Sequence, residues 1–317
     1  MGGERDGRGE PIHPVRELEL GREPQSSDAP ASPLGRLLIP FLPVEQPAPR
    51  TPTGFYTDTT VCIGCKACEV ACKQWNQLPA DWFHWTGNSY DNTATLSATS
   101  WRHVKFIEQF PEDDPGRPVT LEGLLDGAGG GRWLMMSDVC KHCVAAPCQH
   151  ACPTGAIIYN EFANVYIQPD ICNGCAYCIA ACPFGVITRS HFDGHAHKCT
   201  LCYDRQRDGL VPACAKACPT QSIQFGPVEE LRERARSRVE ELGERGVAKA
   251  YLYGDEPTAT YSALHSFYLL IDRPATYGLP ESPFNPWRHM KGDYARAIAG
   301  ALGAIAVFLA VVILAGP

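Results

Sequence analysis

The sequence predicts an α+β fold with internal repetition and a single C-terminal transmembrane helix. Its sixteen cysteines fall in four blocks of four, and the first and third blocks match position for position, which indicates a repeated structural unit. Short β-rich runs lie between these blocks, as expected of small hairpins. An uncharged apolar run over 297–315 lies close to the end of the sequence. Nineteen residues of this kind are long enough to cross a bilayer as a helix.

The four cysteine blocks have closely related spacings. The first and third read C-x2-C-x2-C-x3-C, the second C-x2-C-x4-C-x3-C and the fourth C-x2-C-x11-C-x3-C, and proline follows the last cysteine in three of them. This is the pattern of bacterial ferredoxins, in which three thiolates bind one [4Fe–4S] cluster and the fourth binds the neighbouring cluster. Sixteen thiols at four per cluster predict four [4Fe–4S] clusters. The blocks are Cys62, Cys65, Cys68 and Cys72; Cys140, Cys143, Cys148 and Cys152; Cys172, Cys175, Cys178 and Cys182; and Cys199, Cys202, Cys214 and Cys218.

Two other uses of cysteine fit this pattern less well. A disulfide framework is typical of short secreted chains, whereas this chain has 317 residues and shows no signal peptide at its start. Zinc knuckles use C-x2-C pairs around one tetrahedral ion. A zinc site has no use for the third and fourth cysteines of each block, nor for the proline that follows.

The spacing also has a mechanical reason. Gly64 and Gly174 each lie inside a C-x2-C loop, where glycine allows the backbone to turn and aim amides at the sulfurs. The x3 step then enters a helix, and four helical residues rise about 6 Å. The last cysteine of a block therefore projects away from its own cluster toward the next one. The following proline ends the helix or sets its exit.

The composition excludes several classes of function. A net charge of −7 with 20% charged residues leaves no basic footprint, so nucleic acid is not an expected partner. The sequence contains no Gly-x-Gly-x-x-Gly or Gly-x4-Gly-Lys-Ser/Thr motif, which argues against a nucleotide cofactor bound by those motifs. It also lacks the Gly-x-Ser-x-Gly and His-Glu-x-x-His motifs. We therefore expect a protein that carries electrons and has no catalytic residues of its own.

Composition divides the chain into four parts. Residues 1–53 are rich in proline, glycine and charge, so we expect a disordered N-terminal extension, with its apolar segment 37–42 either docked on another subunit or packed as a tail. Residues 54–227 form the predicted four-cluster ferredoxin-like domain, including a tryptophan-rich insertion over 73–139 that we expect to be local core. Residues 228–293 read as a helical and irregular connector that begins with an exposed charged helix, and 294–317 as the transmembrane helix.

The terminal apolar run favours a membrane helix over a buried helix of a soluble core. Trp287 and basic residues precede it, as interfacial anchors do. Arg288, Lys291 and Arg296 lie before the run and no charge follows it. The positive-inside rule therefore predicts a cluster domain that faces the cytoplasm. A periplasmic location is the alternative, if the folded protein is exported together with a partner that carries a twin-arginine signal.

Several stretches make the sequence resemble the iron–sulfur (beta) subunit of membrane-bound respiratory formate dehydrogenases. The cysteine blocks alone fit the beta subunits of many molybdenum oxidoreductases. Two further features narrow the resemblance to the formate dehydrogenase subunits: the insertion and the Tyr-Gly-Leu-Pro region before the span. The resemblance runs from about residue 54 to the end, and residues 1–53 depart from the family pattern. The matching stretches are CIGCKAC at 62–68, WN at 75–76, SATSW at 97–101, CIAACPF at 178–184, KCTLCYDR at 198–205 and YGLPE at 277–281.

The resemblance implies two pseudo-symmetric ferredoxin-like halves, in which the first and fourth blocks fold together and the second and third fold together. It also implies that the first cluster faces a catalytic subunit containing molybdopterin with molybdenum or tungsten. The fourth cluster would face a quinone-binding integral membrane subunit, which is a cytochrome b or haem-free. The implied ligands are Cys62, Cys65, Cys68 and Cys218 for cluster 1; Cys72, Cys199, Cys202 and Cys214 for cluster 2; Cys140, Cys143, Cys148 and Cys182 for cluster 3; and Cys152, Cys172, Cys175 and Cys178 for cluster 4.

Three functions remain open on the sequence. The first is electron transfer in a formate dehydrogenase complex, from the molybdopterin subunit through the four clusters to the quinone-reducing membrane subunit. The second is the equivalent subunit of another molybdopterin oxidoreductase or of a quinone-linked hydrogenase. The third is a soluble ferredoxin-like domain that acts on a substrate itself, which no motif in the sequence supports and the apolar run argues against.

Overall fold

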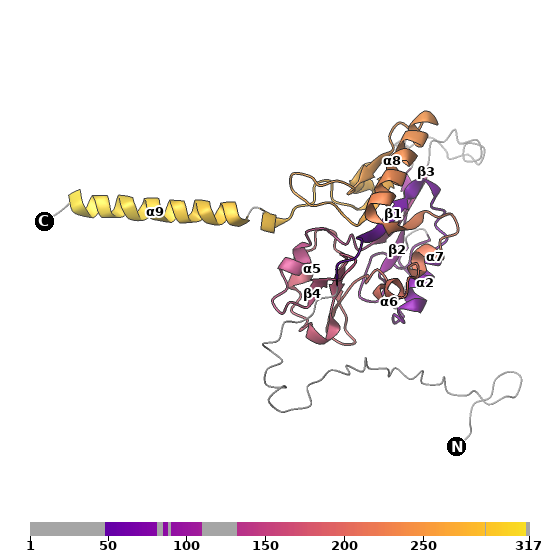
Figure 1. The fold of residues 1–317 in the computed structure, drawn as a ribbon, viewed down its shortest axis with the longest axis horizontal. Coiled ribbons are helices and arrows are strands. Elements are labelled where there is room, and N and C mark those ends of the chain that lie inside the picture. The colour runs from indigo at the N-terminus through magenta and orange to yellow at the C-terminus, as the bar shows by residue number, and fades with distance from the viewer. Residues whose placement is uncertain (1–47, 81–84, 88–89, 110–131, 289, 315–317) are drawn as a thin grey trace, which may run out of the picture. The chain divides into compact units, whose positions relative to one another are not determined.

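The computed structural model describes residues 48–80, 85–87, 90–109, 132–288 and 290–314. Within them, a four-stranded sheet has the order β8-β1-β10-β9, and three two-stranded hairpins accompany it (Figure 1). Strand β1 (Thr53–Asp58) pairs antiparallel with β8 (Ile223–Pro227) and parallel with β10 (Ser266–Leu270), which pairs antiparallel with β9 (Tyr251–Tyr253). The fold is therefore α+β, as predicted, and its central sheet joins segments from both ends of the described residues.

Side chains of β1 are buried on both faces of the central sheet. Successive side chains of a strand point to opposite faces, and Phe55 and Tyr56 are both completely buried. Phe55 belongs to the larger core, which also contains most of the cysteines. Tyr56 packs with Leu231 and Ala235 of helix α8 (Val228–Glu244), which follows β8 directly and covers the other face of the sheet (Figure 1). The cysteine-bearing segments and α8 thus lie on opposite sides of β1.

Gly54 lies at a point where β1 passes very close to the segment before β10. A Cβ atom at Gly54 would lie 1.8 Å from the backbone oxygen of His265. Because that oxygen also accepts a hydrogen bond from the amide of Phe55 at 2.8 Å, it cannot move away freely. Gly54→Ala is expected to destabilise the protein by about 1–3 kcal/mol, measured as a lower melting temperature. The control is Gly226→Ala, because Gly226 pairs with Gly54 across the strands but has open space around it; equal melting temperatures for the two variants would contradict the prediction.

The repeat predicted from the first and third cysteine blocks is confirmed in the backbone. The loop between the 3₁₀ helix η2 (Thr59–Val61) and helix α2 (Ala67–Trp75) has the same conformation as the loop between η3 (Pro169–Ile171) and α5 (Tyr177–Ala181). In these loops Gly64 and Gly174 have φ of +65° and +70°, a region that glycine enters without steric cost. The residues that cap α2 and α5, Lys66 and Ala176, are also left-handed, with φ of 60° and 67°.

The remaining elements are short and lie close to the cysteines. Strands β4 (Ile157–Tyr159) and β5 (Val165–Ile167) form the hairpin expected between the second and third blocks. The insertion contributes a longer hairpin, β2 (Arg102–Gln109) with β3 (Arg132–Val139). The other elements are β6 (Thr188–Arg189) and β7 (Ala196–His197), the helices α4 (Pro147–His150), α6 (Tyr203–Arg207) and α7 (Ala213–Lys216), and the 3₁₀ helices η4 (Pro274–Tyr277) and η5 (Pro286–Arg288).

The prediction that the tryptophans of the insertion form local core is wrong for the residues the structure describes. The side chains of Trp75, Trp85 and Trp133 are 44%, 87% and 47% exposed, and Trp101 is only partly buried. The buried apolar residues of the β2–β3 hairpin are Val104, Leu134, Met136 and Val139 instead, and polar and charged side chains such as Arg102 are buried beside them. A tryptophan can bury its flat face and leave its edge in water, so its size alone does not place it in a core. Trp82 lies outside the described residues, as does the loop at 127–131.

Residues 228–293 differ from the predicted helical and irregular connector. They contain α8, as expected, but also β9 and β10, and residues 266–270 of β10 are buried throughout. The central sheet therefore continues past residue 227. Helix α8 is exposed and charged on one face only, because Val228, Leu231, Ala235 and Leu242 are buried. Strands β1 and β10 pair although more than 200 residues separate them in sequence. No local sequence pattern therefore indicates this pairing.

The structure leaves out most of the N-terminal extension but describes the C-terminal apolar helix. Residues 1–47, most of the predicted disordered extension, lie outside the described residues. Residues 48–53 are held to the turn between β4 and β5, where the amide of Arg50 donates to the backbone oxygen of Glu161 at 2.7 Å. Helix α9 (Met290–Leu314) contains a 20-residue stretch, 292–311, with a mean hydropathy of 1.9 and no buried residue. Its length and composition are sufficient for a membrane span.

Candidate metal centres

Three cavities in the structure are each lined by four cysteines. Each cavity draws its cysteines from two different blocks, three from one and one from another. The first is lined by Cys62, Cys65, Cys68 and Cys218, the second by Cys140, Cys143, Cys148 and Cys182, and the third by Cys152, Cys172, Cys175 and Cys178.

The remaining four cysteines, Cys72, Cys199, Cys202 and Cys214, are all buried. Burial raises the pKa of the Cys72 thiol well above its usual value, and the neighbouring Cys214, Cys199 and Cys202 raise it further. Helix α2, which carries Cys72, packs against α7, which carries Cys214.

Helix α2 separates the two cysteines that it carries. Cys68 lines the first cavity, whereas Cys72, one helical turn later, neighbours the cysteines of the fourth block. Both side chains are buried, with 6% and 5% exposure. The same arrangement recurs around α4, where Cys148 and Cys152 line different cavities. The x3 spacing therefore assigns the last cysteine of a block to a different group of thiols, because it lies a full turn further along its helix.

The chemistry of these groups fits a cluster that carries iron. Burial raises the pKa of Cys68, Cys148 and Cys199 to about 12. Four such thiols cannot all ionise together unless a cation compensates their charge, and iron does so because metal-bound thiols are deprotonated. In the described part of the chain, no three His, Cys, Asp or Glu side chains converge closely enough to bind a single metal ion. The thiols surround a volume and fit a larger group such as a [4Fe–4S] cluster.

Polar groups reach several of the sulfurs. The backbone amide of Leu201 donates to Cys199 Sγ at 3.2 Å, and Tyr261 Oη lies 3.2 Å from Cys143 Sγ. Hydrogen bonds to cluster sulfurs raise the reduction potential of a cluster. Sequence reasoning missed Tyr261, which is 118 residues from its cysteine. It also missed Thr154 and Thr220, whose hydroxyls lie 3.5 and 3.8 Å from the sulfurs two residues before them; the repeated Cys-Pro-Thr sequence could have revealed these two.

Three lysines, Lys66, Lys141 and Lys198, each follow or precede a cysteine directly in the sequence, and two of them are buried and are not surface charges. Lys141 and Lys198 are 1% and 3% exposed. Lys141 forms an ion pair with Asp138. Although burial raises the pKa of Asp138, the cations of Lys141 and Lys105 hold it well below its usual range. Lys66 is partly exposed and pairs with Glu69 and a second carboxylate.

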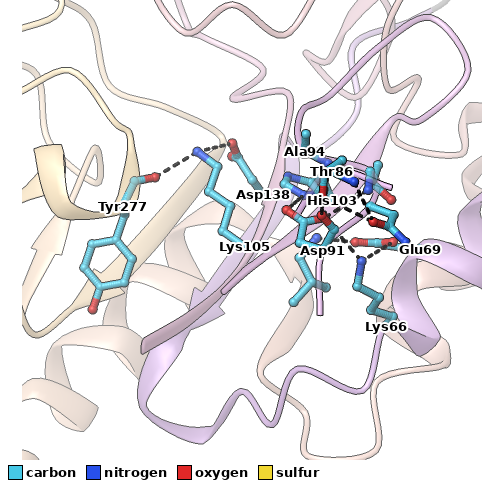
Figure 2. Close-up of polar contacts among 12 residues, drawn as sticks. Lys66, Glu69, Thr86, Asp91, Ala94, His103, Lys105, Asp138 and Tyr277 are labelled. Atoms are coloured by element: carbon cyan, nitrogen blue, oxygen red, sulfur yellow. Dashed lines mark hydrogen bonds and ion pairs between the residues drawn. The ribbon is translucent and has the colours of Figure 1, made fainter. Parts of the chain in front are cut away.

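A polar network attaches the insertion to the first cysteine block (Figure 2). Figure 2 shows Lys66, Glu69, Asp91 and His103 close together, with Lys66 Nζ 3.5 Å from carboxylate oxygens of both Glu69 and Asp91. His103 Nε2 lies 2.9 Å from the other oxygen of Asp91. Glu69 also accepts a hydrogen bond from the backbone amide of Val104 in β2. The β2–β3 hairpin is therefore held against α2, the helix that carries Cys68 and Cys72.

The four groups of cysteines differ in exposure. Cys65 in the first group and Cys175 in the group with Cys152 are exposed, whereas every cysteine of the group around Cys72 is buried. The group around Cys140 is buried except for Cys182, which is half-buried. Two groups therefore reach the surface and two lie inside the protein. A row of electron carriers needs this arrangement, because its end members must approach partners.

Comparisons with known proteins agree with this geometry. Two family models described as "4Fe-4S dicluster domain" match residues 61–156 and 131–228. The nitrate-inducible formate dehydrogenase iron–sulfur subunit of Escherichia coli K12 is 41% identical over 230 residues, which is 71% of each protein. The formate dehydrogenase-O iron–sulfur subunit of the same organism is 42% identical over 233 residues, covering 71% of this protein and 70% of the relative.

A more distant relative is named as part of a different enzyme. It is a subunit of the anaerobic dimethyl sulfoxide reductase of Escherichia coli K12, and it is 33% identical over 184 residues, covering 58% of this protein and 78% of the relative. The match is shorter and weaker than those to the formate dehydrogenase subunits. Together with sixteen cysteines in four groups of four, the comparisons show that this protein binds four [4Fe–4S] clusters and belongs to the family of formate dehydrogenase iron–sulfur subunits.

Proposed function

We propose that the protein passes electrons from a molybdopterin-containing formate dehydrogenase subunit to a quinone-reducing membrane subunit. The observation that carries the proposal is the set of four cysteine groups, two of which include an exposed cysteine while the group around Cys72 is wholly buried. Each bound [4Fe–4S] cluster would accept and release one electron. The protein's own residues hold the clusters, exclude water from the inner two and leave the outer two accessible to partners.

For the ligands of the four clusters we propose the assignment that the family resemblance implies. Three of its four sets each line one cavity, and in the fourth set the helices that carry Cys72 and Cys214, α2 and α7, pack together. Cluster 1 would then be bound by the group containing Cys65, cluster 2 by the group around Cys72, cluster 3 by the group around Cys140 and cluster 4 by the group containing Cys175. Clusters 1 and 4 are the two with exposed cysteines.

Electrons would enter at cluster 1. Cys65 is exposed, and the neighbouring Ile63 is 59% exposed. Val70 on the following helix is 67% exposed, and Trp133 of the β2–β3 hairpin is 47% exposed. Apolar and aromatic side chains of this kind around a functional group are typical of the core of a protein interface. This surface is where we expect the catalytic subunit to dock.

Electrons would leave at cluster 4, near the start of the membrane helix. Trp287, in the 3₁₀ helix η5 just before α9, lies with its ring centroid 5.8 Å from that of His150 in α4. Asn285 donates to the backbone oxygen of Ala145 at 3.1 Å. Cys152, two residues after the end of α4, lines the cluster 4 cavity. The membrane helix therefore begins close to the segment that would bind cluster 4.

We also propose that the cluster domain faces the cytoplasm. Basic residues precede the candidate span, which the positive-inside rule associates with a cytoplasmic N-terminal side. Export together with a folded partner would reverse this orientation. Protease digestion of sealed vesicles of known orientation distinguishes the two, because the cluster domain is cut only when it lies outside.

Formate is expected to reduce the clusters only in the assembled complex. The protein has no open metal coordination position and no activated nucleophile among the residues that line its cluster sites, so it should be reduced by dithionite but not by formate when alone. In the complete complex, formate should bleach the visible absorbance of the clusters and a quinone should restore it. Nitrate, dimethyl sulfoxide and hydrogen are added to separate samples as controls. A redox response to one of these, with none to formate, would reassign the protein to another oxidoreductase complex.

A further inference from the structure

Arg102, the first residue of β2, is a fully buried cation that contacts two cysteine groups. Its side chain is 2% exposed. One terminal nitrogen donates to Cys214 Sγ at 3.2 Å, and the other donates to Ser137 Oγ at 3.3 Å. Ser137 Oγ in turn lies 3.3 Å from Cys68 Sγ. The guanidinium therefore reaches the cluster 2 group directly and the cluster 1 group through a single hydroxyl.

Lys198 is a second buried cation beside the cluster 2 group. Its side chain is 3% exposed, and its ammonium donates to the backbone oxygens of Val165 and Cys199. Cys199 belongs to the cluster 2 group. Val165, whose backbone oxygen accepts from Lys198, lines the cluster 3 cavity. Lys198 thus lies where the cluster 2 and cluster 3 groups meet.

Within the described residues, these two cations differ from Lys66 and Lys141 in having no carboxylate partner. Lys66 pairs with two carboxylates and Lys141 pairs with Asp138. Among the residues that the structure describes, neither Arg102 nor Lys198 has an acidic side chain within ion-pair distance. A buried charge without a partner is costly by several kcal/mol. The negative charge that can balance them is that of the cluster thiolates.

We propose that Arg102 and Lys198 raise the reduction potentials of the clusters at the two inner junctions of the row, and that cluster 2, which borders both, holds an electron most strongly. The proposal rests on the ligand assignment given above. Each reduction adds one negative charge to a cluster, and a nearby cation stabilises that charge more strongly in a buried, weakly polar site than in water. Charge and hydrogen bonding at the sulfurs are established determinants of cluster potential.

A purely structural role for Arg102 makes a different prediction. Its guanidinium also lies 4.7 Å from the ring centroid of Phe55, so it contributes to packing of the core. Loss of packing would lower thermal stability but leave the potentials of intact clusters unchanged. The potentials of the individual clusters therefore separate the two roles.

The test is a mediated redox titration of the full-length protein in its complex, followed by electron paramagnetic resonance after iron content is measured. R102Q and K198Q each remove one buried positive charge, whereas R102K keeps a positive charge at position 102. K66Q is the matched control, because it removes a partly exposed cation that is already paired with carboxylates. R102Q is expected to lower the reduced-to-oxidised ratio of cluster 2 about tenfold at fixed ambient potential, which is about 59 mV for one electron. Cluster 1 should shift in the same direction and cluster 4 should not. K198Q should shift clusters 2 and 3, whereas R102K and K66Q should change cluster 2 much less.

Two results would overturn the proposal. One is an unchanged cluster 2 ratio in iron-replete R102Q and K198Q, and the other is an R102K variant that shifts as far as R102Q. If R102Q fails to retain iron, K198Q and R102K decide the question. Mediators, and not formate, set the potential in this titration. A complex that does not respond to formate can therefore still show these shifts, and failure of the proposed function can be told apart from failure of this proposal. An error in the ligand assignment would show separately, as loss of the wrong signal in single cysteine variants.

Discussion

Replacing Cys72 by serine is expected to remove cluster 2 and leave cluster 1 intact, although Cys72 belongs to the first cysteine block. The reason is that Cys72 lies one helical turn beyond Cys68 and neighbours Cys199, Cys202 and Cys214. Purified anaerobically, the wild-type protein should contain about sixteen irons per chain and the variant about twelve. Electron paramagnetic resonance of the reduced protein should show the loss of one signal.

Cys68→Ser is the matched control for this experiment. Cys68 is on the same helix and equally buried, but it lines the cavity of cluster 1. Both variants should lose about four irons, and they should lose different signals. Loss of the same signal from both would show that one block binds one cluster, and the exchange of the last cysteine between groups would be wrong.

Deleting residues 294–317 is expected to release the protein from membranes without loss of iron. The apolar stretch of α9 has no buried residue, and no cysteine lies beyond Cys218, so the cluster domain loses neither core nor ligands. A membrane-spanning helix anchors a protein far more strongly than surface contacts do. Expressed without its partners, the truncated protein should appear in the soluble fraction after membranes are washed with carbonate.

A point substitution checks the same helix without shortening it. Ile305→Arg places a charge near the middle of the apolar stretch, where arginine costs about 2.5–3.5 kcal/mol for insertion. This variant should lose much of its membrane association and keep its iron content. Val228→Ala, a small change in the buried face of α8, should stay in the membrane fraction. Retention of the truncated protein in washed membranes would contradict the assignment of α9 as the anchor.

Features that depend on neighbours in sequence could be predicted before the structure was known. The cysteine spacing predicts four clusters, and the glycine positions predict the left-handed turns found at Gly64 and Gly174. The hairpin of β4 and β5 lies where its β-rich runs indicated. These features are local because a turn, a hairpin or one helical step is set by a few adjacent residues.

Features that depend on distant pairing were missed. The strand β10 lies in a region read as a connector, because its apolar run finds its partner β1 far away in sequence. The exposed edges of Trp75 and Trp133 depend on which elements happen to cover them. Arg102 gives no sign in the sequence of its contact with Cys214, 112 residues away. Propensity and spacing carry no information about such contacts, since tertiary packing decides them.

The sequence by itself determined that this protein binds four [4Fe–4S] clusters and contains an apolar helix long enough to span a membrane, because thiol spacing and an uncharged run are properties of continuous segments. Only the tertiary structure decided which groups are buried and which charges face them. Cys68 and Cys72 illustrate the difference: four residues apart, they belong to different groups. Their separation requires α7 and the loops around it to pack on both sides of one helix, and that packing is a property of the whole fold.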